Sequence, residues 1–90
     1  MNNWNTDTDM LIIDVEGDTP RTEAYSWERV REIVGGFVEI LPLSEGLYIM
    51  VNEEGRLQDL PLNPLVAWQG QPLHRLHGAV VVVSGHLILV

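Results

Sequence analysis

VREIVGGFVEILPLSEGLYIMVNEEGRLQDLP, residues 30–61, is the stretch that decides the fold of this chain. A short helix, a double glycine, two apolar strands and a Glu-Glu-Gly turn follow one another in it. Gly35-Gly36 ends the helix, because a glycine can take the left-handed conformation that closes a last turn. The two strands, at 37–43 and 47–52, are separated by a short loop, so they are expected to pair antiparallel.

The residues before this stretch predict one more strand and the start of the helix. A mostly apolar run at 9–15 is typical of a strand that is buried on at least one face. Ser26 is a good N-cap for a helix over 27–34, whose apolar residues recur at helical spacing. These residues are Trp27, Val30, Ile33 and Val34.

The residues after it predict short elements and a closing hairpin. Asn52-Glu53-Glu54-Gly55 indicates a turn that leads into a short segment at 56–60, and Asn63-Pro64 favours a helical turn over 65–68. The chain then indicates a strand at 79–83, a tight turn at Ser84-Gly85 and a last strand at 86–90. Because that last strand has no charged side chain, we expect it to lie centrally in the sheet or in a homodimer interface, with the central position favoured.

These elements together predict an α+β class: a small, mostly antiparallel sheet with one helix packed on a face and a short second helical turn. Ninety residues are expected to form a single domain over 9–90, after a flexible N-terminus at 1–8. The sequence has no cysteine, no signal peptide pattern and no apolar run long enough to span a bilayer. We therefore expect a cytoplasmic protein without a disulfide.

The charge of the chain is strongly negative and unevenly distributed. Thirteen acidic residues stand against five arginines and no lysine, which gives a net charge of −8. After Asp59 the chain has no further acid, and only Arg75 and three histidines can carry charge. This balance disfavours direct binding to nucleic acid or to an anionic membrane. The negative charge either serves only to keep the protein soluble or, as the more specific hypothesis, forms a face that binds a basic protein.

The motifs REIVGGFVEILPL, GLYIMVNEEGRL and LPLNP resemble those of an uncharacterised family, domain of unknown function 3846. The matching positions are 34–37, Glu39, 52–55 and 60–63, and the resemblance extends over 10–85. It implies an accessory protein of phages, plasmids or bacterial genomes, and it implies no activity and no catalytic residues. By analogy with small acidic proteins of such genomes, it suggests a protein that blocks a host protein, in some cases by mimicking nucleic acid phosphates.

Candidate partner-binding residues are the acids along the first two-thirds of the chain and one tryptophan that could be an exposed hot spot. A solvated turn or strand end is the alternative for each acid, and a core position is the alternative for the tryptophan. The candidates are Asp14, Glu16, Glu39, Glu45, Glu53, Glu54, Asp59 and Trp68.

No catalytic residue, cofactor or metal site is expected. The serines occupy cap and turn positions without a base beside them, and Gly35-Gly36 follows a helix, where it cannot cradle a phosphate. His74, His77 and His86 are the only candidate metal ligands, and ordinary surface or hydrogen-bonded histidines are the favoured interpretation.

Two functions remain open from the sequence. The leading hypothesis is a non-enzymatic acidic protein-binding module of phage or mobile-element origin that engages a basic host protein, in the manner of a host-defence inhibitor. The alternative is an oligomeric domain that binds a small ligand or nucleotide in a pocket between helix and sheet, lined by Trp27 or Trp68.

Overall fold

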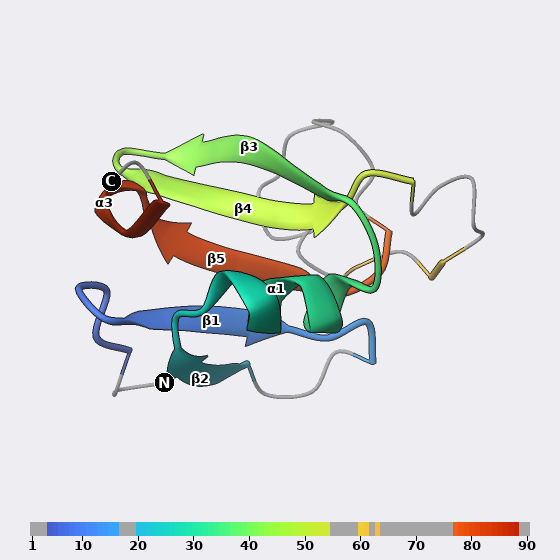
Figure 1. Cartoon of the computed structure of the whole chain (residues 1–90), viewed down its shortest axis with the longest axis horizontal. Helices are drawn as coiled ribbons and strands as arrows, with labels where there is room; N and C mark the ends of the chain where they lie inside the picture. The colour runs from blue at the N-terminus through green and yellow to red at the C-terminus, as the bar shows by residue number, and fades with distance from the viewer. Residues whose placement is uncertain (1–3, 17–19, 55–59, 62, 64–76, 89–90) are drawn as a thin grey trace.

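The computed structural model describes residues 4–16, 20–54, 60–61, 63 and 77–88. These residues form one sheet with the strand order β2-β1-β5-β4-β3, in which every neighbouring pair is antiparallel (Figure 1). The predicted α+β class is confirmed. The elements are β1 (Asp9–Ile13), β2 (Arg21–Ala24), α1 (Trp27–Val34), β3 (Val38–Ser44), β4 (Leu47–Asn52), β5 (Val80–Ser84) and α3 (Gly85–Ile88).

Helix α1 has the predicted bounds and the predicted caps. The Ser26 hydroxyl accepts a hydrogen bond from the Arg29 backbone N–H at 3.3 Å, which satisfies one of the free donors of the first turn. Gly35 closes the helix with φ +77°, and its N–H donates to the Arg31 carbonyl at 2.9 Å. Local sequence signals therefore set both ends of the helix.

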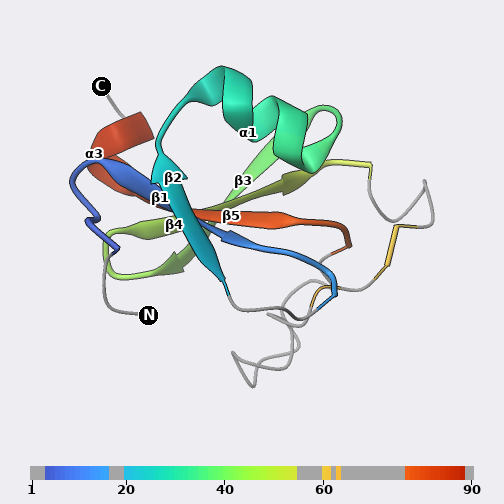
Figure 2. The same ribbon diagram turned by 90° about the horizontal axis from the view of Figure 1, so that it is seen from below.

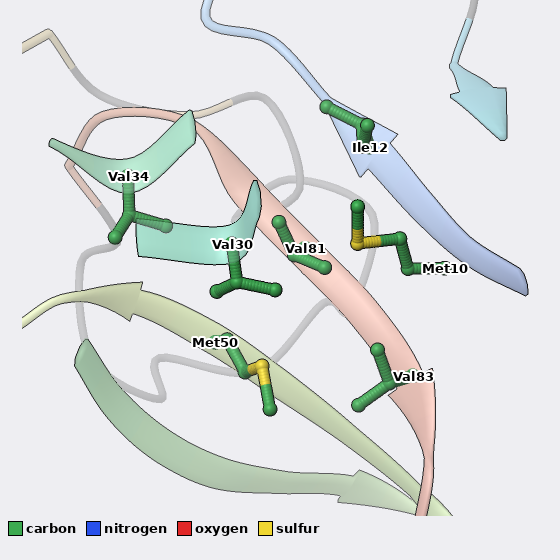
Figure 3. Packing of buried hydrophobic residues seen from close by; sticks show 7 residues of the cluster. All are labelled: Met10, Ile12, Val30, Val34, Met50, Val81 and Val83. Atoms are coloured by element: carbon green, nitrogen blue, oxygen red, sulfur yellow. The ribbon is translucent and has the colours of Figure 1, made fainter. Parts of the chain in front are cut away.

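The sheet is apolar on both faces, and α1 covers one of them (Figure 2). Val30 and Val34 of the helix pack on side chains from three adjacent strands, as Figure 3 shows. The strand residues are Met10 and Ile12 of β1, Met50 of β4, and Val81 and Val83 of β5. On the opposite face a second buried cluster holds Leu11, Ile49, Val51, Val80 and Val82, with Trp4 packed against it. Burial on both faces explains why β5 is a continuous run of valines.

Strands β3 and β4 form the predicted hairpin. Val38 pairs with Asn52 and Pro42 with Tyr48, and the register shifts by a bulge before Ser44 pairs with Leu47. Gly46 in the connecting turn has φ +72°, a conformation that glycine adopts without strain.

The predicted last strand at 86–90 is wrong, because the chain turns into helix α3 at Gly85. A hairpin strand there would have to pair with β5, and both sides of β5 are already occupied, by β1 and β4. The chain instead folds over the end of the sheet, where Ile88 packs against the helix-side cluster. The short second helical element is therefore α3, whereas the predicted turn at 65–68 lies outside the described residues.

Other predicted bounds differ slightly. β1 ends at Ile13 instead of residue 15, β3 is displaced by one residue from 37–43, and β5 by one from 79–83. The segment predicted at 56–60 lies outside the described residues apart from Leu60.

Strand β2 was missed, because its sequence Arg-Thr-Glu-Ala has no apolar alternation. It is held by pairing to β1 and by an ion pair to α1, in which Arg29 Nε and Nη2 donate to the two Glu23 carboxylate oxygens at 2.8 and 3.1 Å. This hydrogen bond to Arg29 lowers the pKa of the Glu23 carboxyl below its ordinary value. Neither α1 nor α3 is long and apolar enough to cross a membrane.

Candidate functional site

The strand directions bring four of the predicted acids to one end of the sheet. β1 and β4 are both antiparallel to β5, so they run in the same direction and their last residues lie at the same end (Figure 1). Asp14 and Glu16 follow β1 there, and Glu53 and Glu54 follow β4. Glu45 lies in the β3–β4 turn at the opposite end.

The remaining predicted residues do not join this group. Glu39 is exposed at the second position of β3, and its partner Val51 belongs to the cluster on the face away from α1, so Glu39 points to that face. Within the group of four acids, Asp14 forms an ion pair with Arg21, which partly neutralises the charge of Asp14. Asp59 and Trp68 lie outside the described residues. The predicted acids therefore occupy several surfaces of the domain.

An open depression of about 500 Å³ lies where helix α1 ends and β3 begins. The helix contributes Glu28, Arg31 and Glu32, and the turn after β4 contributes Glu54. Phe37, which links the helix to β3, is 73% exposed, so its ring offers an uncovered apolar surface. Gly36 completes the lining.

Asn52 holds the two sides of this depression together. Its side-chain amide donates to the Val34 carbonyl at the end of α1 at 3.0 Å, and its Oδ1 accepts from the Glu54 backbone N–H at 2.7 Å. Asn52 is buried, and its contact with the Val34 carbonyl is shielded from water, whereas its contact with Glu54 is partly buried. The Glu53 N–H donates to the Phe37 carbonyl at 2.8 Å. The acidic turn and the exposed aromatic residue are thus fixed relative to each other.

The described lining of the depression carries a net negative charge. It contains three glutamates and one arginine, and the Glu32 carboxylate also pairs with Arg29 at 3.2 Å on the neighbouring turn of the helix. Among the described residues, Arg31 has no carboxylate within ion-pair distance. An exposed aromatic ring among carboxylates suits a cationic side chain, which can contact the ring face and the acids together.

The family can be assigned from a sequence match over most of the chain. Residues 8–86 match the model of a family described as Domain of unknown function (DUF3846). The chain belongs to this family. No curated protein and no solved structure matches it.

The match to DUF3846 includes the whole depression, whose main members sequence reasoning missed. Glu28 and Glu32 lie outside the apolar stripe of the predicted helix and were not among the candidate residues, and Phe37 was placed in the predicted strand at 37–43. The four-residue spacing of the two glutamates puts them on one face of the helix, which was a usable signal. The exposure of Phe37 was not readable, because an aromatic residue at a strand start is more often buried.

The histidines of this DUF3846 domain that can be described make ordinary hydrogen bonds. His77 Nδ1 lies 2.8 Å from the Leu60 carbonyl oxygen, and His86 Nδ1 lies 2.8 Å from the Ser84 hydroxyl. The expectation that no serine has a base beside it is therefore wrong for Ser84, because the turn into α3 brings His86 next to it. No group of three metal-ligating side chains gathers within the described ranges, and His74 is outside them.

Proposed function

We propose that this DUF3846 domain is a non-enzymatic protein-binding module of phage or mobile-element origin that acts in the cytoplasm of a bacterial host. In this proposal its acidic surface binds a host protein with a basic surface and blocks or modulates that protein. The origin and the inhibitory role rest on the family resemblance, and the chemistry of the contact rests on the residues described above.

The observation that carries the proposal is the depression around Phe37. Among the described residues, three carboxylates and the guanidinium of Arg31 line it, and the ring of Phe37 is largely exposed. Aromatic side chains that stay exposed on small domains are common anchors of protein interfaces, and surrounding charge of one sign guides the approach of a partner of the opposite sign. The net charge of −8 adds to this attraction at long range.

The alternative, a pocket for a small ligand or nucleotide between helix and sheet, has less support. Val30 and Val34 fill the space under α1 together with the strand side chains. Trp27 lies at the helix start and is 44% exposed. A nucleotide phosphate would also meet the net negative lining of the depression, which repels it.

Salt-dependent capture from a bacterial lysate tests the proposal. The wild-type domain and the double variant Glu32→Gln/Glu54→Gln are immobilised side by side, and bound proteins are eluted by a salt gradient. We expect basic proteins to be retained by the wild type and released early from the double variant. Arg31→Gln, which removes the cation contributed by the helix, should retain the same proteins to higher salt. Equal retention by all three would overturn the proposal.

Inhibition by mimicry of nucleic acid has its own test. If the carboxylates stand in for phosphates, a DNA duplex should displace a captured host protein, and the Glu32→Gln/Glu54→Gln variant should compete more weakly with DNA. A ternary complex of domain, host protein and DNA would exclude mimicry without excluding protein binding.

A further inference from the structure

Strand β3 forms one edge of the sheet. One contact shows which of its backbone groups face β4 and which point outward. The Glu53 N–H donates to the Phe37 carbonyl, so this opposed pair is hydrogen-bonded. Hydrogen-bonded and non-hydrogen-bonded pairs alternate along an antiparallel ladder. The backbone groups of Glu39 and Leu41 therefore point to β4, whereas those of Val38, Ile40 and Pro42 point away from it.

The outward positions offer hydrogen-bonding groups that no described residue uses, beside apolar side chains. Val38 and Ile40 each present an N–H and a carbonyl, and Pro42 presents a carbonyl only. β3 is the last strand on its side of the sheet within the described residues. Ile40 is 44% exposed and points to the same face as its partner Met50, which is the face that α1 covers.

The other edge is less suited to receive a strand. β2 has four residues against seven in β3, and Arg21 and Glu23 of β2 are engaged in ion pairs with Asp14 and Arg29. A longer edge with free donors is the better template for an added strand.

The charge of the β3–β4 hairpin indicates what kind of strand could pair with the β3 edge. From Val38 to Glu54 the hairpin carries glutamates and no arginine, lysine or histidine. Two copies of β3 would bring two such hairpins together, so self-pairing is opposed by like charge. A basic segment is attracted instead. The glutamates are Glu39, Glu45, Glu53 and Glu54.

We propose that a basic segment of the partner adds to the sheet as a strand beside β3, with alternating arginine or lysine and apolar residues. Its backbone bonds to the outward groups of Val38 and Ile40. Its apolar side chains contact Ile40 on the helix side, and its cations reach Glu39 on the other face. This inference rests on the proposed binding of a basic partner and adds the mode of contact.

A synthetic peptide of alternating arginine and valine, with blocked ends, is the probe. Amide hydrogen exchange of the full chain, followed by NMR with and without peptide, measures the protection of each β3 amide. The Val38 and Ile40 amides should exchange at least about tenfold more slowly when the peptide is bound. The Glu39 and Leu41 amides, which already face β4, serve as internal references. A peptide with glutamate in place of arginine should give no protection.

Ile40→Pro supplies the decisive variant. It removes the outward N–H and leaves the ladder to β4 intact, because the Ile40 N–H does not face β4. Ile40→Val is the matched control that keeps the N–H. With a native-like amide spectrum confirmed for both, Ile40→Pro should weaken peptide binding about tenfold or more, and Ile40→Val should bind like the wild type.

The other outcomes separate this inference from the proposed function. If peptide shifts the Phe37 and Glu54 resonances while Val38 and Ile40 exchange as before, the strand addition is wrong and acidic docking stands. No shift anywhere up to millimolar peptide contradicts both. Protection of Val38 and Ile40 that rises with protein concentration alone would assign the edge to a second copy and overturn the inference.

Discussion

The backbone N–H of Glu53 donates to the carbonyl of Phe37 at 2.8 Å, and this contact links the acidic turn after β4 to the residue that precedes β3. It places the exposed ring beside the carboxylates without using any side-chain atom. The same contact sets which backbone groups of β3 face outward. This one pair therefore places Phe37 next to the acidic turn and determines which backbone groups of the β3 edge point outward.

Phe37→Ala should separate binding from stability. The ring is 73% exposed, so its removal should change the free energy of unfolding by only about 0.5 kcal/mol. Binding of the arginine-valine peptide should fall about tenfold, because an exposed ring that can accept an arginine beside the acidic turn is lost. Denaturant unfolding and peptide titration measure the two effects. Trp27→Ala, which removes another exposed aromatic residue outside the depression, should leave peptide binding unchanged; an equal loss there would contradict a local role of Phe37.

The two glycines after α1 should respond to alanine for different reasons. Gly35→Ala should cost about 1 kcal/mol because Gly35 has φ +77°, although its added methyl would meet open space. At Gly36 an added Cβ would lie 2.9 Å from Asn52 Nδ2, which is held by the Val34 carbonyl. Gly36→Ala should therefore cost about 1–3 kcal/mol through that buried hydrogen bond. The helix cap alone suggests that Gly36 tolerates alanine better, so a neutral Gly36→Ala in a thermal melt would contradict the contact with Asn52.

The ion pair between Glu23 and Arg29 should make stability depend on acid pH. The hydrogen bond from Arg29 lowers the pKa of Glu23 from its ordinary value of 4.5, so the folded state favours the charged carboxylate. That stabilisation is present above pH 4.5 and disappears as the pH falls through the lowered value. Glu23→Gln should therefore be less stable than the wild type at pH 7, and the difference should shrink in acid. In an Arg29→Gln background the same change should have little effect, and a full effect there would assign the stabilisation to another partner.

Met50 and Ile40, which are opposed across β4 and β3, should differ in their contribution to the core. Met50 is fully buried under α1, so Met50→Ala should cost about 2–5 kcal/mol. Ile40 is 44% exposed, so Ile40→Ala should cost about 1 kcal/mol or less. Urea unfolding of the two variants compares them directly. Similar losses at both positions would mean that Ile40 is covered in solution.

Local sequence signals made α1 and β4 predictable. The wrong last strand and the missed strand β2 both depend on tertiary contacts. Ser26 and Gly35 act on their own neighbouring backbone groups, so the helix could be placed to the residue. The valine run of β5 also indicated a strand, but nothing within 84–90 reveals that β1 and β4 occupy both sides of it. The chain after Ser84 therefore forms α3 despite its apolar residues. β2 depends on its pairing with β1 and leaves almost no hydrophobic pattern.

From the sequence, only the acidic charge of the candidate site could be predicted, and not which residues lie close together in it. The turn at Glu53 and Glu54 was recognised, because Asn-Glu-Glu-Gly is a turn sequence with two exposed acids. Its closeness to Glu28 and Glu32 depends on how α1 lies across the sheet, and the hydrogen bond from Asn52 to Val34 that fixes this spans distant residues. The exposure of Phe37 follows from the same packing.

Photo-crosslinking in living bacterial cells shows whether the surface around Phe37 contacts a basic host protein. A benzophenone amino acid replaces Phe37 in one variant and Ala24, an exposed residue on the opposite edge strand, in a control. We expect the Phe37 position to crosslink a host protein with a basic surface, Glu32→Gln/Glu54→Gln to reduce this crosslink, and the Ala24 position not to form it. The same crosslinked proteins at both positions, or a Phe37 product that is acidic and insensitive to the glutamate changes, would contradict this expectation.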